Sequence, residues 1–157
     1  MRLSTREDVE APVEFVWQLL SDFVVWERAA LRRGVEVERM AGTPDARPGM
    51  GWQVRFGFQG KAREMALRLA EIEPGQRMIF EGQSNSVRAN LWLDVVQLGP
   101  RRTRIAVVSE LKPQTITARV FVQSLRLARA RIQQKYEQRV AGFAADIEDR
   151  WRSRRAA

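Results

Sequence analysis

The chain of 157 residues contains neither cysteine nor histidine. Without these residues there is no disulfide, no thiol nucleophile and no zinc site of the Cys/His type. The Ser-His-Asp and Cys-His mechanisms are excluded as well, because both need an imidazole base. A metal site built from carboxylates alone is possible, but the sequence contains no motif that indicates one. We therefore expect no cofactor and no metal centre, and any catalysis would depend on carboxylates, lysine, arginine, water or the single tyrosine, Tyr136.

Long apolar runs are also lacking. No stretch approaches the roughly eighteen consecutive apolar residues that a membrane span requires. The first eight residues lack the apolar core of a secretory signal, so the default expectation is a cytoplasmic protein. The length and the hydrophobic fraction of 45% are those of one globular domain. With no internal repeat and no long linker, we expect a single domain over residues 1–157.

The net charge of +8 is unevenly distributed. Up to Leu111 there are 16 basic and 15 acidic residues, whereas from Lys112 onward there are 11 basic and 4 acidic residues, a net charge of +7. This distribution argues against nucleic acid as the partner and favours a solvated basic face on the last segment. An alternative is contact of that face, through residues such as Arg119, Arg126 and Arg129, with an anionic membrane or an acidic partner.

Apolar and polar residues alternate with a period of two through most of the chain, which is typical of half-buried strands. The predicted strands cover residues 2–10, 35–40, 50–58, 61–72, 77–83, 87–98 and 102–111. Turn residues separate the later strands, as in Glu73-Pro74-Gly75-Gln76. The stretch 41–49 is the richest in turn residues and is a candidate mobile rim.

Three segments have helical periodicity instead. Val13, Val16, Trp17 and Leu20 predict a short helix after Pro12, and Asp22 can cap a second short helix that ends at Gly34. From Gln114 to Arg152 the spacing predicts one long helix, capped by Thr115 or Thr117. Its apolar stripe consists of Phe121, Leu125, Ala128, Ile132, Tyr136, Val140, Phe143, Ile147 and Trp151.

These elements predict an α+β fold, in which short hairpins build an antiparallel sheet around the long helix. Four segments carry a family resemblance: residues 9–17 (Val-Glu-Ala-Pro-Val-Glu-Phe-Val-Trp), 49–52 (Gly-Met-Gly-Trp), 71–78 and 111–113. With them the chain resembles the START/Bet v 1-like (SRPBCC) superfamily, and within it the bacterial polyketide cyclase/dehydrase type. The resemblance implies a helix-grip fold, with a curved sheet of about seven strands wrapped around a long C-terminal helix and two short helices after the first strand.

The superfamily includes lipid carriers, hormone and sterol binders, cyclases, dehydratases and quinone-binding proteins, so the fold alone does not select a function. A sheet closing around one helix leaves room for a hollow, and the inward positions either fill a core or line a cavity. The candidate ligand-binding residues are Trp52, Phe56, Phe58, Met65, Leu67, Met78, Phe80, Leu91, Leu93, Ile105, Val107 and Ser109 on the strands, with Leu125, Ile132 and Tyr136 on the helix.

Binding or carriage of a lipid-like, quinone-like or polyketide-like molecule is the leading hypothesis. The second is a cyclase or dehydratase, with Glu7 as base and Tyr136 as acid. The third is an interaction module that uses the basic helix face. Apolar residues on the outer face of the sheet, Ile79, Trp92 and Val96, are either scattered surface groups or a patch for a homodimer.

Overall fold

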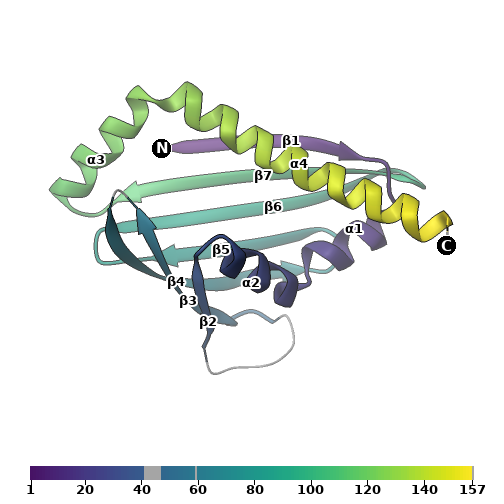
Figure 1. Ribbon diagram of the computed structural model, residues 1–157, viewed down its shortest axis with the longest axis horizontal. Coiled ribbons are helices and arrows are strands. Elements are labelled where there is room, and N and C mark those ends of the chain that lie inside the picture. The colour runs from purple at the N-terminus through teal and green to yellow at the C-terminus, as the bar shows by residue number, and fades with distance from the viewer. Residues whose placement is uncertain (41–46, 59, 157) are drawn as a thin grey trace.

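The computed structural model describes residues 1–40, 47–58 and 60–156 (Figure 1). Seven antiparallel strands form one sheet in the order β1-β7-β6-β5-β4-β3-β2. The elements are β1 Arg2–Val9, α1 Val13–Leu20, α2 Phe23–Arg32, β2 Glu36–Arg39, β3 Gly51–Phe58, β4 Lys61–Glu73, β5 Arg77–Gln83, β6 Val87–Gly99, β7 Arg102–Pro113, α3 Ile116–Leu127 and α4 Arg129–Ala156. The helix-grip architecture expected from the sequence is confirmed. Of the predicted rim at 41–49, residues 41–46 lie outside the described residues.

Local signals in the sequence fix several boundaries of these elements. The Asp22 carboxylate accepts a hydrogen bond from the Val25 N–H and caps α2. The Thr115 hydroxyl accepts one from the Ala118 N–H and caps α3. Gly75 has a φ of +76°, which the turn between β4 and β5 requires and which a residue with a side chain rarely adopts. The predicted caps at Asp22 and Thr115 and the predicted hairpin turn are therefore confirmed.

The last helix differs from the prediction, because it is two helices and not one. At Ala128 the backbone leaves the helical region, and the Ala128 N–H bonds to the Leu125 carbonyl, three residues back. In Figure 1, α4 crosses the sheet beside β1, and α3 turns away from this direction at the far end of the sheet. α3 is also rotated relative to the predicted stripe, since it buries Ala118 and Val122 and leaves Phe121 and Leu125 half-buried.

The solid core lies under α1 and the C-terminal half of α4. Ile147 and Val16 are fully buried, and Ala144 is nearly so. The indole of Trp151 packs on the ring of Phe15 with centroids 5.1 Å apart. Beneath these helices the sheet contributes further buried residues, including Val9, Leu69, Met78 and Ile105. No helix in the described part of the chain is long and apolar enough to cross a membrane.

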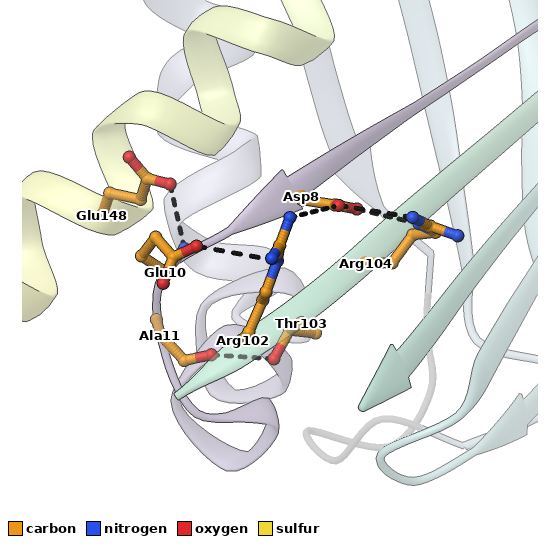
Figure 2. A network of polar contacts seen from close by, with 7 residues as sticks. All are labelled: Asp8, Glu10, Ala11, Arg102, Thr103, Arg104 and Glu148. Atoms are coloured by element: carbon orange, nitrogen blue, oxygen red, sulfur yellow. Dashed lines mark hydrogen bonds and ion pairs between the residues drawn. The ribbon is translucent and has the colours of Figure 1, made fainter. Parts of the chain in front are cut away.

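A polar network holds β1, β7 and α4 together at this end of the molecule (Figure 2). The Asp8 carboxylate accepts hydrogen bonds from the guanidinium groups of Arg104 (2.8 Å) and Arg102 (3.1 Å). The Thr103 hydroxyl donates to the Ala11 carbonyl at 2.8 Å. Glu148 on α4 accepts from the Glu10 N–H at 2.9 Å. The network therefore fixes the sheet edge to the helix where the core is also most tightly packed.

This network makes stability depend on pH at Asp8. The hydrogen bond from Arg104, with its charge and that of Arg102, holds the Asp8 pKa below its usual value of 3.8. Ionised Asp8 therefore stabilises the fold above that value, and this contribution is lost as the pH falls through the lowered pKa. We expect Asp8→Asn to lower the melting temperature at pH 7 and to have a smaller effect at pH 2. Thermal denaturation measures both melting temperatures. An equal decrease at pH 7 and at pH 2 would contradict the role of ionised Asp8.

Candidate functional site

Two rows of inward-facing side chains cross the middle of the sheet. In one row, Leu67, Gly82, Ala89 and Leu111 stand opposite one another on β4, β5, β6 and β7. In the next, Leu69, Phe80, Leu91 and Ser109 are aligned, and Leu3 of β1 completes the row. Gly82 and Ala89 have little or no side chain, so the first row leaves a depression in the sheet, which the Met65 side chain fills in part over Gly82.

The space above this depression is a cavity of about 330 Å³ beneath α3 and α4, which we call the α3–α4 cavity. Leu125 of α3 and Ile132 of α4 form its roof. It is lined by Met1, Leu3, Leu67, Phe80, Gly82, Ala89, Asn90, Leu91, Ser109, Glu110, Leu111, Leu125 and Ile132. Since α3 bends away at Ala128, the helix pair roofs this part of the sheet without filling it.

A second cavity of about 330 Å³ lies between the sheet and α2, and we call it the α2 cavity. It is lined by Leu20, Phe23, Trp26, Glu27, Ala30, Val35, Val37, Trp52, Val54, Leu67, Met78, Phe80, Leu91 and Leu93. Phe23 packs edge-on against both Trp52 and Phe80, with centroids 5.3 and 6.1 Å apart. Leu67, Phe80 and Leu91 line both cavities, so the two spaces adjoin.

The predicted ligand-binding residues divide into two groups. Those that line a cavity are Trp52, Leu67, Met78, Phe80, Leu91, Leu93, Ser109, Leu125 and Ile132. Those outside both linings are Phe56, Phe58, Met65, Ile105, Val107 and Tyr136. Ile105 and Val107 are buried in the core, while Phe58 is 40% exposed at the end of the sheet. The alternation of a strand predicts which face of the sheet a residue is on. It does not predict whether the space above that residue is open or filled by the helices, and this explains the division.

Tyr136 and Ser109 are brought together, as their hydroxyl oxygens lie 2.8 Å apart. Burial raises the pKa of the Tyr136 phenol, and the hydrogen bond to Ser109 offsets this only in part. Tyr136 therefore stays protonated near neutral pH. Because Ser109 lines the α3–α4 cavity, the pair places a neutral hydrogen-bonding group at its wall.

Glu7 occupies a different position. It stands opposite Ile105, four residues along β1 from Leu3, which is the register partner of Ser109. At about 3.3 Å per residue this separation is roughly 13 Å along the strand. Within the described residues the Glu7 carboxylate makes no hydrogen bond or ion pair. No hydrogen bond among the described residues therefore joins the proposed base to the proposed acid.

Sequence reasoning missed a charged group at the α2 cavity. Glu27 accepts two hydrogen bonds from Arg39, at 3.1 and 2.8 Å, and one from the Trp52 indole at 2.9 Å. Glu27 lies four residues after Phe23, so helical spacing could have placed it on the apolar face of α2. Among the described residues, no group of three or more acidic side chains is placed to hold a metal ion.

No family model and no curated protein matches the chain. Solved structures do. The Zhui aromatase/cyclase from a Streptomyces species matches with a TM-score of 0.66 and 14% identity, over 96% of this chain and 94% of its own. A START superfamily protein from Mycobacterium smegmatis gives 0.57 and 16%, over 87% and 97%. Norcoclaurine synthase from Thalictrum flavum gives 0.62 and 14%, over 80% and 76%. At these identities the likeness shows the helix-grip fold alone.

Proposed function

We propose that this helix-grip protein binds a small hydrophobic molecule in the two adjoining cavities. The observation that carries the proposal is the pair of apolar spaces of about 330 Å³ each, which share Leu67, Phe80 and Leu91. Their size is that of small-molecule sites, and their walls are almost entirely aliphatic and aromatic. Burying apolar ligand surface there would supply roughly 25 cal/mol per Å².

The experiment that tests binding is a fluorescence titration with cis-parinaric acid, an apolar polyene probe that brightens when it leaves water. Saturable, one-to-one uptake supports the proposal. Native mass spectrometry of gently purified protein provides a second readout, because a retained guest would add its mass. A bare mass together with no uptake of the probe would argue against any ligand-binding role.

A cyclase or dehydratase remains the second hypothesis, supported by the likeness of the fold to an aromatase/cyclase and to norcoclaurine synthase. The geometry favours it less than binding. Tyr136 has a raised pKa and bonds to Ser109, while Glu7 lies in another part of the sheet. Such a reaction would have to depend on the shape of the cavity and on the reactivity of the substrate itself.

The outer face of α3 supports peripheral contact with an anionic membrane. Ile116, Val120 and Leu127 are 80%, 62% and 91% exposed, and their spacing places them on one side of the helix. Arg119 and Arg126 flank this apolar stripe and are exposed. An exposed apolar stripe bordered by arginines is typical of helices that lie in the interface of anionic lipids.

We expect the protein to sediment with vesicles that contain phosphatidylserine and not with pure phosphatidylcholine vesicles. Changing Ile116, Val120 and Leu127 together to serine should weaken binding at least about ten-fold, because three apolar side chains no longer enter the membrane. The control changes Gln134 and Gln138, which are exposed on α4, to serine. If the stripe variant binds as tightly as the wild type, α3 is not the contact. A homodimer through Ile79, Trp92 and Val96 stays a prediction.

A further inference from the structure

Two arginines of the sheet face the inside of the grip, Arg39 of β2, which pairs with Glu27, and Arg63 of β4. Arg63 on β4 shares the inward phase of Met65 and Leu67 and is half-buried. Its guanidinium carbon lies 5.9 Å from the centre of the Phe58 ring and 5.8 Å from that of Phe121. The two rings pack edge to face at 5.6 Å and join β3 to α3. The cation therefore lies against these two rings at the α3 end of the molecule. We call Arg63, Phe58 and Phe121 together the aromatic box.

This guanidinium has no anionic partner in the described part of the chain. Its Nε is buried and makes no hydrogen bond. Other arginines of the sheet are paired: Arg68 with Glu81, and Arg77 with Asp94. A guanidinium carries five N–H donors and does not lose its charge, so leaving it partly desolvated without an acceptor costs free energy. The contacts with the two rings offset some of that cost but use none of the donors.

None of the three residues of the box lines the α3–α4 cavity, but the same two elements, α3 and β4, contribute to both. Phe121 is one helical turn before Leu125, which forms part of the cavity roof. Arg63 is four residues before Leu67, which is part of the floor, or roughly 13 Å along β4. Met65 lies between them, with its sulfur over Gly82. α3 and β4 thus contribute apolar residues to the cavity, and further along they hold an unpaired cation.

We infer that Arg63 binds the carboxylate of an amphipathic ligand whose apolar chain occupies the α3–α4 cavity. The inference rests on the proposed function and specifies its ligand class as a fatty-acid-like monocarboxylate. A carboxylate matches the fork of a guanidinium and forms charge-assisted hydrogen bonds with it. The aromatic box fixes the plane of the guanidinium, so little side-chain freedom is lost when the anion binds.

The test compares two probes of equal chain length, laurate and 1-dodecanol, by calorimetric titration at neutral pH. The wild type should bind laurate about ten-fold or more tightly than 1-dodecanol, since hydrogen bonds to charged groups are the stronger ones. Arg63→Met should remove this preference and leave the affinity for 1-dodecanol unchanged. Arg63→Lys, which keeps the charge without the fork, should be intermediate.

Arg68→Met is the matched control, because Arg68 is on the same strand but pairs with Glu81 outside the grip. It should bind both probes as the wild type does. Equal affinity of the wild type for the two probes, or a preference for laurate that survives Arg63→Met, would overturn the assignment. If neither probe binds the wild type, both the proposed function and the assignment of Arg63 fail. If the wild type binds laurate and 1-dodecanol equally well, the proposed function stands and only the assignment of Arg63 as the carboxylate site is rejected.

Discussion

Leu91→Trp is expected to abolish ligand uptake while the fold is retained. Leu91 lines both cavities, so an indole at this position occupies the space where they meet. Overpacking a solid core costs about 1–3 kcal/mol, but here the added volume enters existing space and the cost should lie at or below that range. We expect the affinity for cis-parinaric acid to fall at least about ten-fold. Fluorescence titration measures the loss, and circular dichroism checks the fold.

Val96→Trp provides the matched control. Val96 is on the same strand, β6, and is 50% exposed on the outer face of the sheet. A slightly larger increase in size at this position should leave the titration curve unchanged. Undiminished uptake in the Leu91 variant would mean that the guest is bound elsewhere. A loss of uptake in both variants would show that size at the cavities is not the cause.

Of the substitutions proposed, Ile147→Ala should cause the largest loss of stability. The free energy of unfolding should fall by about 2–5 kcal/mol. Ile147 is fully buried in the half of α4 that packs over the solid core. Removing its side chain leaves a hole that this tightly packed end cannot close. Urea denaturation followed by circular dichroism measures the change.

Leu127→Ala, at the last residue of α3, is the comparison. Leu127 is 91% exposed, so its truncation should change stability by less than about 0.5 kcal/mol. The contrast tests whether the C-terminal half of α4 is packed into the core while the outer face of α3 is free. A cost of less than about 1 kcal/mol for Ile147→Ala, or an equal cost at both sites, would contradict this arrangement.

The sequence predicts the sheet well because the pattern that defines a strand is local. Trp52, Leu67 and Leu91 each lie in the inward phase of a period-two pattern, and each faces inward as expected. Caps such as Asp22 and Thr115 are equally local, since one side chain bonds to an N–H three residues on. These signals need no knowledge of tertiary contacts.

The features that create the site are not local. The break at Ala128 has no glycine or proline to mark it, and the apolar spacing runs straight through it. Gly82 and Ala89 matter because they stand opposite each other, which depends on the register of β5 and β6. Arg63 looks like an ordinary strand arginine until Phe121, from a distant segment, is seen beside it. Three-dimensional pairing, and not composition, determines where the hollow and its charged end lie.

The central claim is that a guest is held between the sheet and the helices, and methyl NMR tests it most directly. Laurate titrated into protein with labelled Leu, Ile and Val methyl groups should shift the signals of Leu67, Leu91, Leu125 and Ile132, which line the cavities. The signals of Val9 and Ile147, buried in the solid core, should change little. Shifts confined to surface residues such as Val96 and Leu98, or no shifts at saturating laurate, would contradict the account.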